Sequence, residues 1–216
     1  MGDYWEQRFS SEGMIWGKSP SRTAYHALEI FKEHHVQSVL VPGSGYGRNT
    51  KAFSSIFDVE GIEISTEALA IAEEWDPDSR FIQGSCLEPI LPNKTYDAVY
   101  CFDVLHLFLA KERKQLIENC LHHLNPSGLV YFTCFSDQDK NYGVGAKIEE
   151  GTYEYIQGKY AHFFSEKDLL QHFSQLQILE TGSCKEILNY NDHSTKEYHL
   201  RYIVGRKIQK VNHDEP

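Results

Sequence analysis

The stretch that decides the fold is "VLVPGSGYGRNT", residues 39–50, which places three glycines at alternate positions. The apolar run 38–42 is typical of a short buried parallel strand, and residues 50–56 after the glycines predict a helix. A glycine-rich turn between a strand and a helix is a common site for a nucleotide. The spacing of the glycines then indicates which nucleotide fits.

That spacing argues against a dinucleotide. The fingerprint G-x-G-x-x-G, counted from Gly43, requires a third glycine at the position of Arg48. Alternation of Gly43, Gly45 and Gly47 instead removes side chains from one face of the backbone. Such a face suits a flat, weakly charged ligand, and the simpler alternative is a turn that binds nothing.

An acidic residue follows the turn at a suitable distance. Glu63 stands 18 residues after Gly45, near the end of a second predicted strand over residues 58–64. A carboxylate at the end of a strand accepts hydrogen bonds from the 2′- and 3′-hydroxyls of a ribose. The alternative is a solvated acid in a loop.

Strands and helices alternate along the rest of the chain. Seven strands with interleaved helices predict an α/β three-layer sandwich, with a mostly parallel sheet and a C-terminal antiparallel hairpin. The predicted strands are 38–42, 58–64, 79–84, 96–102, 129–135, 176–182 and 197–206. The predicted helices begin at Pro20 after Ser19, at residue 50, after Ser65, at residue 111 and after Ser165.

Composition limits the classes of partner. The 216 residues carry a formal net charge of −10, and no run of Lys or Arg is present, which disfavours nucleic acid. Five cysteines without a CxxC pair indicate reduced thiols. We see no membrane span and no signal peptide, so we expect a cytoplasmic protein. The paired histidines 34–35 and 122–123 are poor metal ligands, and no metal site is expected.

Five segments in order carry a family resemblance: "VLVPGSGYGRNT", "GIEIS", "FIQGSCLE", "YDAVYCFDVLHLF" and "LNPSGLVYF". Together they resemble the class I S-adenosylmethionine-dependent methyltransferases, of the type 11 methyltransferase-domain group, from residue 37 to about 135. The later strands extend the resemblance to about residue 206. The segment "YWEQRFSSEGMIWGKSPS", residues 4–21, is similar to the thiopurine-methyltransferase-like and tellurite-resistance-like branch.

The resemblance implies one Rossmann-like domain over residues 1–210. Its parts would be an N-terminal lid or helix segment (1–36), a cofactor-binding half (37–135) and a substrate-side half (136–206). Residues 207–216 would form a flexible tail.

The resemblance also implies a set of cofactor contacts. Glu63 would hold the ribose, Ile64 would pack on the adenine, and Trp16 would close over the cofactor. Ser85 and Cys86 stand where many relatives carry an acid for the adenine amino group, so a hydroxyl or backbone groups would serve here. The implied contacts are Trp16, Gly43, Ser44, Gly45, Glu63, Ile64, Ser85, Cys86, Cys101 and Phe102. Candidate cations for the cofactor carboxylate are Arg8, Lys18 and Arg22.

Methyl transfer from a sulfonium is an in-line displacement, and the leaving group departs neutral. The protein therefore mainly positions the acceptor and excludes water, and it supplies a base only for a protonated nucleophile. Asp103 and His106 follow the strand 96–102 and are the catalytic candidates, although a pocket-lining histidine is the plainer alternative. Residues 137–162 are a candidate lid, and we expect a small-molecule acceptor.

Two other functions compete. An NAD(P)-dependent oxidoreductase or epimerase would use a Tyr-x-x-x-Lys pair, and Tyr155 does stand four residues before Lys159. That stretch is glycine-rich with weak helical character, which argues against the pair. A non-catalytic module that binds adenosylmethionine is the third possibility.

Overall fold

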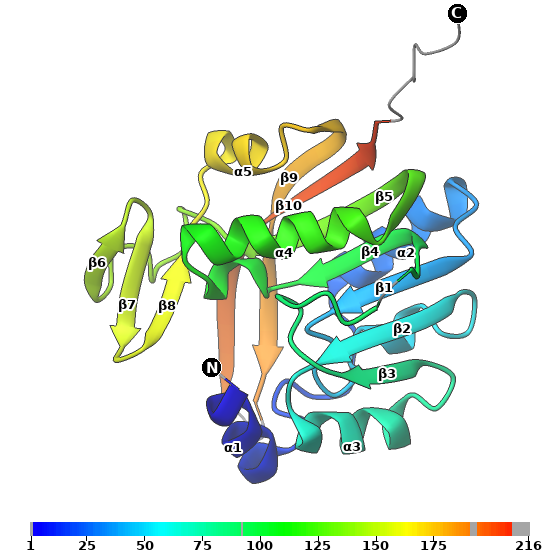
Figure 1. The fold of residues 1–216 in the computed structure, drawn as a ribbon. Coiled ribbons are helices and arrows are strands. Elements are labelled where there is room, and N and C mark those ends of the chain that lie inside the picture. Colours follow the sequence, from blue (N-terminus) through cyan, green and yellow to red (C-terminus); the bar gives the residue numbers. More distant parts are fainter. Residues whose placement is uncertain (1, 92, 191–193, 209–216) are drawn as a thin grey trace, which may run out of the picture.

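The computed structural model describes residues 2–91, 93–190 and 194–208, and its centre is one seven-stranded sheet (Figure 1). The strands lie in the order β3-β2-β1-β4-β5-β10-β9. Their bounds are β1 Ser38–Pro42, β2 Asp58–Glu63, β3 Arg80–Gln83, β4 Tyr96–Phe102, β5 Leu124–Phe135, β9 Leu176–Asn189 and β10 Thr195–Lys207. The first five strands pair in parallel, and β10 pairs antiparallel with both β5 and β9. The predicted fold, with its antiparallel C-terminal hairpin, is confirmed.

Helices cover both faces of the sheet. The longer ones are α1 Gly2–Glu12, α2 Arg22–Glu33, α3 Thr66–Trp75, α4 Ala110–His122 and α5 Glu166–His172. One core lies between the sheet and α4 with α5, for example Val99, Leu116 and Phe173. A second core lies under α2, where Phe31 and Tyr131 are buried. Two buried layers are what a mostly parallel sheet requires, because its strands are apolar on both faces.

The predicted cap residues are partly right. The side chains of Ser65 and Ser165 accept from backbone N–H groups in the first turns of α3 and α5, as expected. The prediction of Ser19 and Pro20 for α2 is wrong. Ser21 caps that helix by accepting from the N–H of Ala24, 3.1 Å away.

The helix predicted for residues 50–56 is also wrong. Only one 3₁₀ turn forms, η1 Thr50–Ala52. The Thr50 and Ser54 hydroxyls each donate to the fully buried carboxylate of Asp76, at 2.6 Å. These bonds tie the segment to the end of α3, and side chains that bond locally in this way compete with helix formation.

A second, three-stranded antiparallel sheet was not predicted. It comprises β6 Ala146–Glu149, β7 Thr152–Ile156 and β8 Lys159–His162. Figure 1 shows it beyond the carboxyl ends of β1 to β4, the side of the molecule that α1 also borders. A short turn, η2 Leu105–Leu107, precedes α4 on this side.

The predicted flexible tail has a different start. Lys207 ends β10, and its Nζ donates to the carbonyls of Leu121 and Leu124 at 2.7 and 2.6 Å. Residues 209–216 lie outside the described residues. None of the described helices has both the length and the apolar character needed to cross a membrane.

Candidate active site

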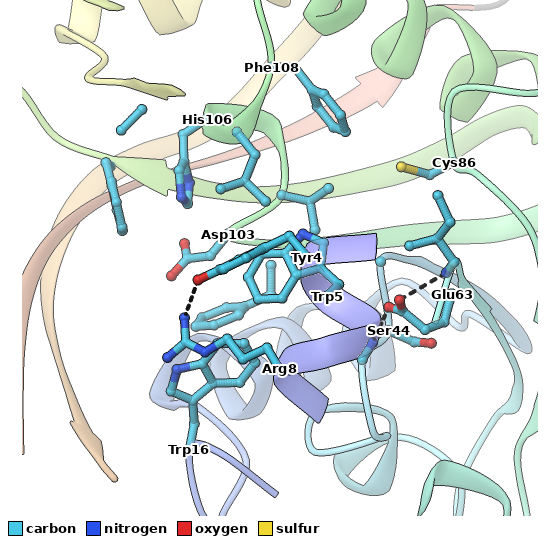
Figure 2. A pocket seen from close by; sticks show the side chains of 18 of the residues that line it. Tyr4, Trp5, Arg8, Trp16, Ser44, Glu63, Cys86, Asp103, His106 and Phe108 are labelled. Carbon is cyan, nitrogen blue, oxygen red and sulfur yellow. Dashed lines mark hydrogen bonds between the residues drawn. The ribbon is translucent and has the colours of Figure 1, made fainter. Parts of the chain in front are cut away.

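A cavity of about 660 Å³ lies at the carboxyl ends of the parallel strands. This is the edge where open α/β sheets bind their ligands, and the volume falls in the range of small-molecule sites. Its walls come from α1, the glycine turn, the ends of β2 to β5, the small sheet and the C-terminal hairpin. Figure 2 shows Glu63 and Ser44 on one side of it and His106 with Asp103 on the other.

The glycine turn lines the cavity in a backbone conformation that side chains avoid. Gly43, Gly45 and Gly47 have φ of 65°, 56° and 78°, the left-handed region in which glycine carries no steric penalty. A Cβ on Gly43 would stand 2.5 Å from a methyl carbon of Val104. The alternation seen in the sequence is therefore required by both backbone angle and space.

Glu63 is buried, with 6% of its surface exposed, and it holds the turn in place. Its Oε2 accepts from the N–H of Gly45 at 2.9 Å. Its Oε1 accepts from the N–H groups of Ile64 and Ser65 at 2.8 and 2.9 Å. A carboxylate has about four lone-pair sites, so one remains for a ligand without breaking these bonds. Burial raises the pKa of this carboxyl, while the three N–H donors lower it.

The residues on the adenine side of the predicted site also line the cavity. Ile64 is 40% exposed, which is unusual for a large apolar side chain and suits a flat apolar ligand. The Ser85 hydroxyl accepts from the N–H of Leu87 at 3.2 Å. Burial raises the pKa of the Cys86 thiol to about 12. Cys86 is therefore a neutral thiol at neutral pH.

Helix α1 lies across the glycine-turn side of the cavity. Its Trp5 and Phe9 pack with Trp16 and with Tyr46 of the glycine turn, with ring centroids 5.9–6.2 Å apart. The Tyr46 hydroxyl donates to the carbonyl of Gly17 at 2.7 Å and accepts from the N–H of Trp16 at 3.1 Å. The turn and the N-terminal segment are thus built as one unit.

Two polar contacts fix the outer side of α1. The carboxylate of Glu6 accepts from the hydroxyls of Ser65 and Thr66 at the start of α3, and these bonds lower its pKa. Nζ of Lys159 on β8 lies 3.0 Å from the centroid of the Tyr4 ring, a cation–π contact. Helix α1 therefore touches both α3 and the small sheet.

Of the three candidate cations, only Arg8 lines the cavity. Its guanidinium donates to the Tyr4 hydroxyl at 2.9 Å (Figure 2) and to Glu12 at 3.2 Å. Lys18 instead lies 5.3 Å from the Trp75 ring centroid, and Arg22 does not line the cavity.

Asp103 sits at the end of β4 in a strained conformation, with a φ of 54°. Thr133 on β5 holds it there. The Thr133 hydroxyl donates to Asp103 Oδ1 at 2.8 Å and accepts from the Asp103 N–H at 2.9 Å. Burial raises the pKa of Asp103 to about 7. The carboxyl therefore changes its protonation state near neutral pH, as a general base should.

His106 is a neutral part of an aromatic wall. Its ring stacks on Phe135, with centroids 3.7 Å apart and planes at 16°. Only 3% of His106 is exposed, and burial lowers its pKa to about 3. Nδ1 has no hydrogen-bond partner within the described chain. Such a buried, unpaired group costs about 1–3 kcal/mol, so a partner from a ligand would stabilise it.

Some predicted contacts lie elsewhere. Cys101 is fully buried among the core residues beneath α4 and does not line the cavity. Successive side chains of a strand point to opposite faces, so Phe102 reaches the cavity and Cys101 does not. Tyr155 and Lys159 lie on the two strands of the β7–β8 hairpin. They do not share the helix face that an oxidoreductase pair would need.

Comparison with known proteins gives a family match for part of the chain. A family model described as a methyltransferase domain matches residues 40–132, which run from β1 into β5 and include the glycine turn, Glu63 and Asp103. The chain contains a methyltransferase domain over residues 40–132. The predicted methyltransferase domain, fold and enzyme class are confirmed. No curated protein sequence matches the chain.

Solved structures share the fold of this methyltransferase domain at low sequence identity. One, from a study of the conversion of a disulfide bond into a thioacetal group during echinomycin biosynthesis, has a TM-score of 0.77 at 16% identity, and the match covers 98% of this chain and 93% of that one. TehB from Haemophilus influenzae has a TM-score of 0.66 at 15% identity, covering 94% and 67%. A 1,6-didemethyltoxoflavin N1-methyltransferase from Burkholderia thailandensis has a TM-score of 0.64 at 18% identity, covering 87% and 78%.

Several cavity residues of the methyltransferase domain were not predicted. Trp5 and Phe9 were detectable, since their i, i+4 spacing places both on one face of a helix. Phe135, Tyr190 and Tyr198 carry no local signal. They reach the site only because β10 returns beside β5, a pairing between segments far apart in the sequence.

Proposed function

We propose that the protein transfers a methyl group from S-adenosylmethionine to a small molecule. The cofactor of this enzyme class is S-adenosylmethionine, which supplies an electrophilic methyl group when bound. The observation that carries the proposal is the buried Glu63 beside a positive-φ glycine turn at the cavity floor. The test is calorimetric titration with S-adenosylmethionine, its demethylated product and NADH. Binding of NADH alone would contradict the proposal.

The chain's own groups suit each part of that cofactor. The remaining lone pair of Glu63 would accept from a ribose hydroxyl, and Ile64 would pack on the adenine. The Arg8 guanidinium would pair with the carboxylate of the methionine part. The rings of Trp16 and Tyr46 would face the positive sulfonium side, an arrangement that aromatic faces favour.

The position of the Arg48 side chain disfavours a dinucleotide as the ligand. Its side chain is buried, forms an ion pair with Glu186 at 3.8 Å and packs over the ring of Phe102. A side chain fixed in this way occupies the position where the dinucleotide fingerprint needs a glycine for close packing.

Asp103 is proposed as the general base and His106 as a neutral wall of the acceptor subsite. The side chain of Asp103 lines the cavity beyond the glycine turn, and the hydrogen bond from Thr133 orients it. His106 is disfavoured as a base because its pKa of about 3 leaves it too weak to hold a proton at neutral pH. Of the two catalytic candidates from the sequence, we therefore propose only Asp103 as a base.

Replacement of Gly43 by alanine is expected to reduce cofactor affinity by at least tenfold. The new Cβ would displace Val104, and with it the turn that carries Asp103. Gly13→Ala is the matched control, because Gly13 also has a positive φ of 60° but nothing within 4 Å of its Cβ. The control should lose only about 1–2 kcal/mol of stability, the cost of the left-handed conformation. Equal affinities in a titration of both variants would contradict the assignment.

Helix α1 is proposed to close over the cofactor. Glu6→Ala removes the contact with α3 and is expected to raise the dissociation rate of S-adenosylhomocysteine several-fold, measured by stopped-flow tryptophan fluorescence. Asp3→Ala removes one acid from an exposed position of the same helix and should leave the rate unchanged. If both variants release the ligand at the wild-type rate, α1 is not a cover.

A further inference from the structure

One end of the small sheet is bonded to the start of α4. Glu149 ends β6, Thr152 begins β7 and His162 ends β8, and Thr152 lies directly opposite His162 across the two strands. The N–H of Ala110, the first residue of α4, donates to the Glu149 carboxylate at 3.0 Å. We call this end of the small sheet its base, and Figure 1 shows it beside α4.

The His162 ring is bonded at both nitrogens. Nε2 lies 2.7 Å from Oδ2 of Asp168 on α5, and Nδ1 lies 2.7 Å from the hydroxyl oxygen of Thr152. A carboxylate only accepts hydrogen bonds, so Nε2 carries the hydrogen, and the hydroxyl donates to Nδ1 of the neutral ring. His162 is 3% exposed and Thr152 is fully buried. Any rotation of the ring would therefore leave buried polar groups without partners, which is costly.

Arg113 of α4 extends these contacts to α5 and to the turn before α4. Its Nε donates to Nε2 of His172 at 3.3 Å, and Nδ1 of His172 donates to the carbonyl of Asp168 at 2.9 Å. Its Nη1 donates to the carbonyl of Phe108, a cavity residue, at 2.7 Å. The same guanidinium pairs with Glu149 at 3.4 Å. The base network comprises Arg113, Glu149, Thr152, His162, Asp168 and His172.

The residues on either side of His162 form part of the cavity wall. Ala161 and Phe163 line the cavity and His162 does not, because successive side chains of an extended chain point to opposite faces. The ring of Phe163 lies 5.7 Å from that of Phe135, which stacks on His106. The bonds of His162 therefore fix the wall at the end of the cavity where His106 lies.

The proton occupancy of His162 is coupled to the closure of the base. The charged and titratable groups on the elements packed around it are Asp168 and His172 of α5, Arg113 of α4, Glu149 of β6 and His106 of η2. Burial lowers the pKa of His162, the bond to Asp168 offsets part of this, and the charge of Arg113 lowers the pKa again. A ring released from the base regains its ordinary pKa of about 6.5. Protonation should therefore favour release as the pH falls through that value.

We propose that His162 is a positioning residue for the methyl-acceptor end of the cavity, and that its proton occupancy sets how firmly the small sheet closes that end. The inference rests on the proposed methyl transfer for the name of that end, whereas the hold on the sheet requires no cofactor. With His162 neutral, the base network keeps Ala161 and Phe163 in the wall. A second proton on the ring loosens the sheet.

The test is amide hydrogen exchange, measured by mass spectrometry on the full chain without ligand. His162→Ala removes both ring bonds and is expected to speed exchange in residues 146–163 at least tenfold at pH 7.5, relative to residues 66–75 of α3. His162→Gln should restore part of the protection, because its amide can still donate to Asp168. Equal exchange in the wild type and His162→Ala would overturn the proposal.

A smaller change tests the same network if His162→Ala does not fold. Thr152→Val removes one hydroxyl and should speed exchange in residues 146–163 at least threefold. Thr23→Val is the matched control, since Thr23 is also a buried threonine whose hydroxyl is bonded to a side chain, Tyr100, but it lies in α2. Equal effects of the two variants on the small sheet would contradict a local role of the base network.

A pH profile distinguishes this role from that of an ordinary structural contact. After correction for intrinsic exchange, residues 146–163 should lose protection between pH 7.5 and pH 5.5, and the loss in the wild type should exceed that in His162→Gln at least twofold. His106 and Asp103 are common to both proteins, so the difference reports His162. Identical profiles would overturn the proposal. Because no cofactor is present, this outcome is independent of the calorimetric titration that tests the proposed function.

Discussion

Glu63→Ala is expected to weaken the binding of S-adenosylmethionine by at least 100-fold. The carboxylate accepts from three backbone N–H groups, and under the proposed function its remaining lone pair would accept from the ribose. A hydrogen bond to a charged group contributes about 1.5–3 kcal/mol, and each 1.4 kcal/mol is a tenfold change in affinity. The alanine also leaves three N–H donors without partners, so the glycine turn should lose its shape. Calorimetric titration with the cofactor and its demethylated product measures the effect.

Two further variants make this result specific. Glu63→Gln keeps the size of the side chain and should show a smaller loss, because its amide has one oxygen acceptor and one N–H₂ donor. Glu60→Gln is the matched control, since Glu60 is a buried carboxylate on the same strand that pairs with Lys94 and Arg80 outside the cavity. A folded Glu63→Ala protein with wild-type affinity would remove Glu63 from the site.

Asp103→Asn is expected to lower the rate of methyl transfer about 10²- to 10⁴-fold, the usual contribution of a general base. The amide keeps the shape of the side chain and its hydrogen bond with Thr133 but cannot take a proton from the acceptor. With Asp103 present, activity should rise with pH to a plateau, with its midpoint near the pKa of about 7. The variant should lack that rise, and cofactor affinity should change little. Unchanged turnover by the variant would show that the acceptor needs no base.

The raised pKa of Asp103 can also be tested without a methyl acceptor. The pKa of Asp103 is raised from 3.8 to about 7 by burial, so between these values the folded protein binds more protons than the unfolded chain. Its free energy of unfolding therefore falls as the pH rises through that window. Asp103→Asn does not titrate, so it does not lose stability over this pH window. Relative to the wild type, its melting temperature should therefore rise between pH 4 and pH 7, and the difference should stay constant above pH 7. A constant difference across the range would contradict the raised pKa.

The sequence allowed the sheet and the glycine-turn side of the cavity to be predicted. Apolar strands before Gly43 and Glu63 and the serine caps of two helices are local signals, and each corresponds to an element that forms. The acid at Glu63 was detectable because strand ends of a parallel sheet meet at one edge. The hydrogen bond that Glu63 accepts from the N–H of Gly45 was not, because it depends on how two loops approach each other.

The rest of the fold depends on contacts between distant segments. The helix expected after the glycines does not form, because the hydroxyls of that segment donate hydrogen bonds to Asp76 at the end of α3. The small sheet forms in a glycine-rich stretch. The tyrosines of this stretch suggested a lid, but they did not predict strands. The aromatic wall combines η2, β5 and β10, and no sequence pattern brings those three together.

The contact of Lys159 with Tyr4 bears on the order in which ligands bind and dissociate. Helix α1 and the small sheet both border the cavity, and the Lys159–Tyr4 pair joins them. Movement of either segment breaks that pair, so we expect the entry of one reactant to ease the entry of the other. Helix α1 is also anchored to α3 through Glu6 and packs against the glycine turn. A methylated product would therefore depart first, and the spent cofactor would set the pace of turnover.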